Sequence, residues 1–186
     1  MNTIESRLQS FVKPSSVASQ ITLALLASIG LALCANLRIY LPFTPVPFVM
    51  QNTILLFFAA GLGRWGGLTM AIAFLVQGMA GFSVFSSGAV GFAAFTGPNG
   101  GYLIGYAIAA FIVGALQEKM AIRTTKSLFL HMLIGGGVVY FFGALYLGWI
   151  LGSFQRALLL GVIPFILTDL LKTATLTTLY SVSFKN

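Results

Sequence analysis

The sequence predicts an all-α membrane protein, a bundle of six transmembrane helices. Of its 186 residues, 58% are hydrophobic and 7% are charged, whereas soluble domains carry about 25% charged residues. Since about 20 apolar residues cross the hydrocarbon core of a bilayer, a chain of this length with short connections has room for six spans. We therefore expect one domain over residues 1–186, in which residues 1–16 form a cytoplasmic segment, and a multi-pass protein of the cell membrane.

Six apolar runs carry this prediction. They cover about residues 17–36, 47–62, 65–80, 101–118, 127–151 and 156–182. The second and third runs are short and meet at the glycine-rich turn GLGRWGG, residues 61–67, so we expect them to be tilted, partly interfacial or broken. The sixth helix has two possible starting points, one near Arg156 and one at Pro164, because proline is favoured in the first turn of a helix.

Basic residues predict the orientation, because cytoplasmic loops carry an excess of Lys and Arg. With the N-terminus inside, seven basic residues face the cytoplasm and two face outward. The seven are Arg7, Lys13, Arg64, Lys119, Arg123, Lys126 and Lys185, and the two are Arg38 and Arg156. Both termini are therefore predicted in the cytoplasm, and the loops after the first, third and fifth spans face outward.

Several functional classes are disfavoured. The net charge of +7 could suggest a nucleic-acid partner, but the basic residues are scattered singly between apolar runs and form no stripe. The sequence has no G-x-x-x-x-G-K-[ST] phosphate loop, so it does not hydrolyse ATP by that route. His131 has no second His or carboxylate at metal-ligand spacing, and Cys34 is the one cysteine. We predict no metal, no cofactor and no nucleic-acid partner.

Two of the outward loops are unusually apolar. The first, NLRIYLPFTPVPF over residues 36–48, has three prolines, which favour extended shapes and make a stiff aromatic strap. The second, from Gly81 to Tyr102, has no charged residue but four Phe and six Gly, and we expect it to fold back onto the bundle. The aromatic residues could simply anchor both loops at the membrane interface. Together, however, the loops favour two lids that close over something bound beneath them.

Asp169 and Lys172 lie in the last apolar run, PFILTDLLKTATL. They are three residues apart on a predicted helix, so they share one face and can pair. A lone charge at the centre of a membrane helix costs roughly 2.5 to 3.5 kcal/mol, and pairing offsets only part of this. A purely structural ion pair is the alternative, but intramembrane charges usually face a cavity or a substrate path. We predict that the pair binds a substrate.

Four amide side chains are further candidates for substrate binding. They are Gln51, Asn52, Gln77 and Asn99. Each amide offers donors and acceptors suited to a neutral polar ligand. Amides in membrane bundles also bond across helices, where they contribute about 0.6 kcal/mol, so this bridging role stays open for each of them.

Small residues recur every four positions in the first span, at Ala24, Ser28 and Ala32. Such a stripe lets another helix approach the backbone closely. It serves either internal packing or docking to a partner, and a small membrane protein without its own energy source needs such a partner. We predict docking at these three residues, with internal packing as the alternative.

Three segments together resemble the BioY family, the biotin-binding S components of energy-coupling factor (ECF) transporters. These segments are PFTPVPFVMQN at 42–52, GMAGFSVFSSGAVGFAAFTGPNGGYLIGY at 78–106 and PFILTDLLK at 164–172. They occur in the family's order and span most of the chain. The combination of the proline-rich strap with Gln51 and Asn52, and the similarity of GPNGGYLIGY to the family's G-P-T-G-G-Y-L, are its most specific parts.

The resemblance implies a six-helix membrane subunit that captures biotin from outside. It implies partners as well: a transmembrane T component and two cytoplasmic ATPases. Asp169 and Lys172 match the acid and lysine that contact the ligand in the sixth helix of the family, and the small-residue stripe matches the surface that docks on the T component. A carboxylate would accept from the ureido N–H groups of biotin, while Lys172 either keeps Asp169 ionised or donates to the ligand itself.

Two positions depart from the family pattern. SSGAVGF has Ala89 where the family often has the basic residue of a G-G-R-G-G-like segment, so the partner of a biotin carboxylate is not identified. The family's P-G-D reads Leu167, Thr168 and Asp169 here. An S component for another small vitamin, and a membrane scaffold with a structural ion pair, are therefore kept as alternatives. An enzyme is disfavoured because no nucleophile, metal set or second carboxylate accompanies Asp169.

Overall fold

The computed structural model describes residues 16–35, 38–39, 42–43, 45–46, 48–85, 88–120 and 124–183. The predicted cytoplasmic segment therefore lies outside the described residues except for Ser16. Four of the basic residues used to predict the orientation also lie outside them, namely Arg7, Lys13, Arg123 and Lys185. A fifth, Arg38, has its backbone alone described.

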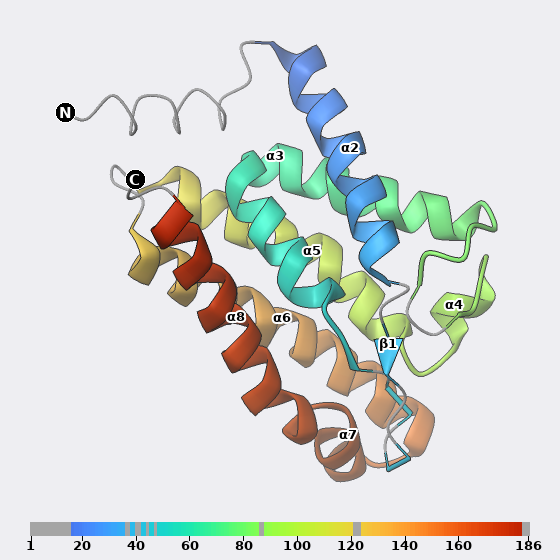
Figure 1. Cartoon of the computed structure of the whole chain (residues 1–186). Helices are drawn as coiled ribbons and strands as arrows, with labels where there is room; N and C mark the ends of the chain where they lie inside the picture. Colours follow the sequence, from blue (N-terminus) through green and yellow to red (C-terminus); the bar gives the residue numbers. More distant parts are fainter. Residues whose placement is uncertain are drawn as a thin grey trace.

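The chain is built almost entirely from helices. They are α2 (Val17–Ala35), α3 (Gln51–Met79), α4 (Ala93–Thr96), α5 (Gly100–Glu118), α6 (Thr125–Leu151), α7 (Phe154–Gly161) and α8 (Ile163–Ser183). Within the described ranges, five stretches are long and apolar enough to cross a membrane, with α7 and α8 forming one of them. The predicted all-α membrane fold is confirmed, and the predicted second and third spans occur as the two halves of α3 (Figure 1).

The two halves of α3 are joined by one non-helical residue, Gly63, with φ 77° and ψ 180°. This conformation strongly favours glycine. Glu118, at the end of α5, accepts from the backbone N–H of Arg64 at 2.8 Å and from its guanidinium Nε at 2.6 Å. A Cβ on Gly114 would collide with the backbone of Gly63, so α5 packs directly on the joint. The tight turn predicted within residues 61–67 is therefore a kink at Gly63, with helix on both sides of it.

The predicted sixth span is broken at Val162, where α7 ends and α8 begins. Pro164 is the second residue of α8, a position that tolerates the missing N–H. Of the two starting points that the sequence left open, the structure shows a main helix that opens at Pro164. Tyr102 of α5 donates to the carbonyl oxygen of Gly161 at 2.7 Å and so satisfies a backbone acceptor at this break.

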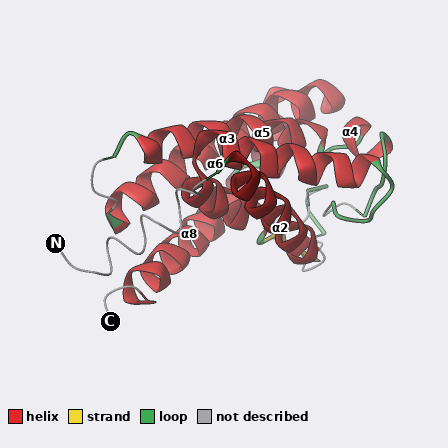
Figure 2. Cartoon of the chain, turned by 90° about the horizontal axis from the view of Figure 1, so that it is seen from above, coloured by secondary structure: helices red, strands yellow, loops and turns green. Residues whose placement is uncertain are grey.

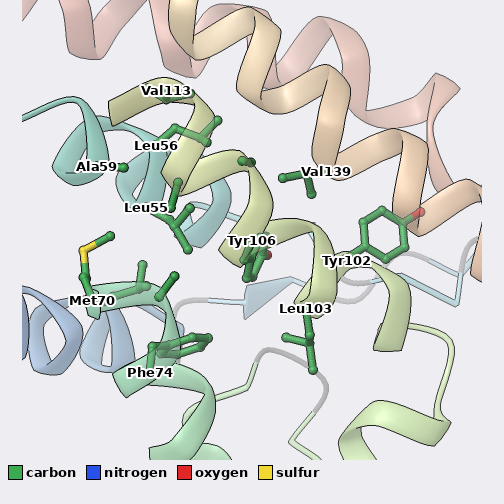
Figure 3. Packing of buried hydrophobic residues seen from close by; sticks show 14 of the residues in the cluster. Leu55, Leu56, Ala59, Met70, Phe74, Tyr102, Leu103, Tyr106, Val113 and Val139 are labelled. Atoms are coloured by element: carbon green, nitrogen blue, oxygen red, sulfur yellow. The ribbon is translucent and has the colours of Figure 1, made fainter. Parts of the chain in front are cut away.

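The core of the bundle surrounds α5. In the apolar 18-residue segment of each span, 61% is buried in α5, 28% in the α7–α8 stretch and 22% in α2. Seen from above, α3, α5 and α6 make the centre of the bundle, and α2 and α8 flank it (Figure 2). Figure 3 shows Leu55 and Phe74, from the two halves of α3, pointing toward Tyr106 of α5. The ring centroids of Phe74 and Tyr106 are 6.5 Å apart.

The first loop contains a short β ladder. β1 (Arg38–Ile39) pairs antiparallel with β2 (Phe48–Val49), and Arg38 lies opposite Val49. Of the prolines and aromatics that predicted a stiff strap, Tyr40 and Pro47 lie outside the described residues. From here on, the name strap refers to residues 38–49. Its β ladder lies at the same end of the bundle as α4 and α7 (Figure 1).

The second loop folds back onto the bundle, as its composition predicts. Phe85 is 1% exposed, and its ring contacts those of Phe74 and Phe95 at centroid distances of 5.4 and 5.9 Å. Tyr146 of α6 donates to the carbonyl oxygen of Phe95 at 2.8 Å. Aromatic packing and one backbone contact therefore hold the part of this loop that the structure describes against the helices.

Candidate functional site

Asp169 lies two turns into α8 and is held by three side chains from three helices. Its Oδ1 pairs with Lys172 Nζ at 2.5 Å. Its Oδ2 accepts from Asn52 Nδ2 of α3 at 3.0 Å and from the Tyr140 hydroxyl of α6 at 2.8 Å. The Asp169 side chain is 17% exposed. The predicted pair forms, and its acid also joins α8 to α3 and α6.

Lys172 connects the same site to the strap. Its Nζ donates to the Val49 carbonyl oxygen at 2.9 Å and lies 4.0 Å from the centroid of the Phe48 ring. A cation over an aromatic face is stabilised by the ring quadrupole. The Lys172 side chain is 9% exposed, and its charge is compensated by Asp169. This geometry places Lys172 between Asp169 and the strap, where it bonds to both.

A hollow, which we call the first hollow, opens beside this pair. Its cavity volume is about 50 Å³, smaller than the roughly 300 to 1,000 Å³ typical of ligand pockets, and part of it is open. Its lining comes from the strap, the second loop and five helices. The lining residues are Val46, Val49, Asn52, Asn99, Tyr102, Leu103, Tyr106, Val139, Tyr140, Gly161, Phe165, Asp169 and Lys172.

Two of the four predicted amides line the first hollow. Asn52 is 8% exposed and Asn99 is 7% exposed. In each, the side-chain oxygen Oδ1 is buried without a hydrogen-bond partner. Because a buried acceptor without a partner is costly, both oxygens are suited to accept from a bound ligand or from water.

The other two amides do not reach the first hollow. Gln77 donates from Nε2 to the Ser28 hydroxyl at 2.8 Å and so joins α3 to α2. Gln51 is 1% exposed, and neither of its amide atoms has a hydrogen-bond partner. Gln77 therefore has the bridging role that was the alternative for each amide, and Gln51 lies in the interior beside the site.

The small-residue stripe of α2 lies inside the chain. Ala24 and Ser28 are 0% exposed, and Ala32 is 8% exposed. Ser28 accepts from Gln77, so the stripe packs against the second half of α3. Of the two roles open from the sequence, the structure shows internal packing, and a partner that approached α2 would meet its other face.

Tyr140, Tyr102 and Val49 are site residues that the sequence reasoning missed. A tyrosine inside an apolar run is usually an ordinary core residue, and Val49 contributes through its backbone oxygen, which no side-chain pattern reveals. The one clue in the sequence was Asp169 itself. A buried carboxylate needs donors beyond one lysine, and the tyrosines of the facing helices are natural candidates.

The arrangement is suited to binding rather than to reaction. It combines one ionised pair, several acceptor oxygens and an aromatic and aliphatic wall. Small polar molecules with an apolar part are held by such mostly apolar pockets with a few placed polar groups.

Comparisons with known proteins agree with this reading of the fold. The BioY family model matches residues 5–185. The biotin transporter BioY of Thermotoga maritima is 32% identical over 72% of this chain and 78% of that protein. The biotin transporter BioY of Rhizobium etli is 35% identical over 80% of this chain and 83% of that protein.

A solved structure has the same fold. It is the crystal structure of the S-component for biotin from an ECF-type ABC transporter, with a TM-score of 0.77 and 24% identity. The match covers 94% of this chain and 95% of the other. The family match over nearly the whole chain and the relatives above 30% identity lead to one conclusion: this chain belongs to the BioY family.

Proposed function

We propose that this protein is the substrate-binding membrane subunit that captures biotin from outside and delivers it for ATP-driven uptake with an ECF module. The observation that supports this most strongly is the partly buried Asp169–Lys172 pair, which faces a hollow beneath the strap. Relatives in the family are named biotin transporters, a description that also agrees with the prediction that the chain is not an enzyme.

The chemistry of the site fits biotin. The ureido ring of biotin carries two N–H donors, and Asp169, Asn52 and Asn99 offer acceptor oxygens in the first hollow. The rest of biotin is apolar apart from its carboxylate, and it matches the tyrosine, valine and phenylalanine side chains of the lining. A charge-assisted bond from a ligand N–H to Asp169 is stronger than one between neutral groups.

The strap and the second loop act as lids in this proposal. Val46 and Val49 of the strap and Asn99, at the end of the second loop, all line the first hollow. Closure over a bound molecule would therefore bring both loops onto it. The proposal places this end outside the cell membrane and both termini in the cytoplasm.

Energy for uptake would come from partners, a transmembrane T component and two cytoplasmic ATPases. The face of α2 that points away from the bundle is available for the T component. It carries Leu26, Ile29 and Leu33, which are 60%, 52% and 68% exposed. On the opposite face of α2, the buried stripe of Ala24, Ser28 and Ala32 packs against α3.

Equilibrium binding of radiolabelled biotin to the purified chain tests the proposal. Saturable binding with one site per chain is expected, and competition by thiamine or riboflavin would instead indicate an S component for another vitamin. Lipoic acid, which has the same acidic tail but no ureido N–H groups, is expected not to compete. Absence of saturable biotin binding would overturn the proposal.

A further inference from the structure

Tyr140 is the one partner of Asp169 that comes from α6. Its hydroxyl donates to Asp169 Oδ2 at 2.8 Å, and its side chain is part of the lining of the first hollow. The same oxygen also accepts from Asn52 Nδ2 at 3.0 Å. A carboxylate offers about four acceptor positions, two on each oxygen, so both positions on Oδ2 are occupied by protein donors.

This occupancy decides which atoms remain for a ligand. Lys172 takes one position on Asp169 Oδ1 and leaves the other free. Asn52 directs its amide nitrogen to Asp169, so its oxygen points elsewhere and is buried without a partner. The free position on Asp169 Oδ1 and the Asn52 oxygen together suit a group with two neighbouring N–H donors.

Asn52, Tyr140 and Asp169 also line a second hollow. This second hollow, with a cavity volume of about 190 Å³ and part of it open, lies between α3, α6 and α8. Its lining includes Asn52, Tyr140 and Asp169, together with Thr53, Leu56, Met132, Leu133, Gly136, Gly137, Ile166, Leu170 and Thr173. Asn52, Tyr140 and Asp169 therefore form a wall shared by the two hollows.

We propose that Tyr140 is a positioning residue for substrate binding: its hydroxyl holds the Asp169 carboxylate in the shared wall, with Oδ1 turned to the first hollow, so that the site accepts two N–H donors of one ligand group. This inference rests on the proposed binding of biotin. Without the hydroxyl, Asp169 Oδ2 loses one of its two donors, and the carboxylate can rotate toward the second hollow.

The test uses the fact that Asp169 is the one aspartate in the sequence. Protein made by cell-free synthesis with aspartate carrying 13C at its side-chain carboxyl carbon gives a single carboxyl resonance. Tyr140→Phe removes the hydroxyl alone. Tyr146→Phe is the matched control, because it also removes one tyrosine hydroxyl bond from α6 but outside the lining of the first hollow.

We expect Tyr140→Phe to move the Asp169 resonance and to weaken biotin binding about tenfold, the effect of losing one hydrogen bond to a charged group. The Tyr146→Phe control is expected to leave the resonance in place. Since groups that act through one another are not additive, Tyr140→Phe should cost little further affinity in the Asp169→Asn background. An unmoved resonance, or losses that multiply in the double variant, would overturn the inference.

Failure of the inference is distinguishable from failure of the proposed function. If the wild-type chain binds no biotin, the proposed function fails. If the wild-type chain binds biotin and Tyr140→Phe binds equally well, the function stands and the positioning role of Tyr140 is rejected.

Discussion

Asp169 is stabilised by a set of donors that no short stretch of sequence contains. Lys172 comes from its own helix, Asn52 from a position 117 residues earlier and Tyr140 from a position 29 residues earlier. Truncating one partner of a buried ion pair is far more costly than the pair's net contribution, because the remaining charge stays buried. Conservative changes are therefore the informative ones at this site.

The first prediction concerns the ion pair. Asp169→Asn and Lys172→Ala are expected to lower biotin affinity at least tenfold, or about 1.4 kcal/mol, because each removes a charge that orients the ligand acceptor. Equilibrium binding to the purified variants measures this, and size-exclusion chromatography in detergent reports whether the fold survives. Thr175→Ala is the control, since Thr175 lies on the exposed face of α8 and bonds to its own helix. If Asp169→Asn and Lys172→Ala instead perturb folding and the folded fraction binds biotin as the Thr175→Ala control does, the pair is purely structural.

The second prediction concerns Asn99. Asn99→Ala is expected to weaken biotin binding by roughly three- to tenfold, the effect of one neutral hydrogen bond, because its unpartnered oxygen lines the first hollow. Gln77→Ala is expected to leave affinity within about twofold, because Gln77 bonds to Ser28, and to act on stability instead. Titration of both variants with biotin compares them directly. A larger affinity loss in the Gln77 variant would contradict the placement of the two amides.

Whether the sequence alone predicts a residue of the site depends on the type of that residue. Asp169 and Lys172 are conspicuous because charges in an apolar helix are expensive, so a sequence pattern finds them. The amides are ambiguous, because an amide satisfies a neighbouring helix as readily as a ligand, and the structure indeed divides them between Asn52 and Asn99 at the first hollow and Gln77 elsewhere. Tyr140 could not be singled out, since only the fold brings it to Asp169.

At the scale of the element, the breaks between helices are harder to predict from the sequence than the helices themselves. Hydropathy locates the apolar runs, and each contains a helix in the structure, although the second run was predicted to begin at residue 47 and its residues Phe48–Val49 form β2. The nature of a joint depends on contacts from elsewhere in the chain. Glu118 and Gly114 of α5 meet the joint at Gly63, and Tyr102 of α5 meets the break between α7 and α8. The sequence places both joints within a few residues but does not reveal that one helix serves both.

The third prediction tests the α3 joint. Gly63→Ala is expected to lower the free energy of unfolding in detergent by about 1 to 3 kcal/mol, because a positive φ with ψ near 180° is essentially restricted to glycine. The new Cβ would also collide with the Glu118 carboxylate. Gly61→Ala is the matched control, because a Cβ on Gly61 would have no atom within 4 Å and alanine favours a helix. Equal melting temperatures for the two variants would contradict the strained joint.

At the scale of the whole molecule, the polar contacts of the candidate site and the apolar core lie in different parts of the bundle. The apolar core surrounds α5, whereas α8 lies at the side and buries Phe165, Thr173 and Thr177 among its described residues. Hydrogen bonds of Asp169 and Lys172 join α8 to α3, α6 and the strap, and the rings of Tyr180 in α8 and Phe57 in α3 also pack at a centroid distance of 5.8 Å. The residues that we propose to bind the substrate therefore also hold one wall of the bundle in place.

The fourth prediction concerns orientation. Phe92, in the second loop, is 75% exposed, and Trp65, beside the α3 joint, is 61% exposed. In a Cys34→Ser background, Phe92→Cys is expected to react with a membrane-impermeant maleimide on intact cells, whereas Trp65→Cys reacts only after the membrane is opened. This follows from the excess of basic residues at the end of the bundle that contains the joint. The reverse labelling pattern would invert the proposed topology and exclude capture from outside.

The joint at Gly63 also has a consequence for how the protein is made. The first half of α3 has 12 residues before Gly63, a length of about 18 Å, which is shorter than the roughly 30 Å of the bilayer core. Such a segment is a poor independent substrate for the insertion machinery. We therefore expect the two halves to enter the bilayer together as a helical hairpin. This hairpin reaches its final packing only after α5, the helix that contacts the joint, has been synthesised. A chain truncated before Gly114 should accordingly be degraded, even though its first three apolar runs are intact.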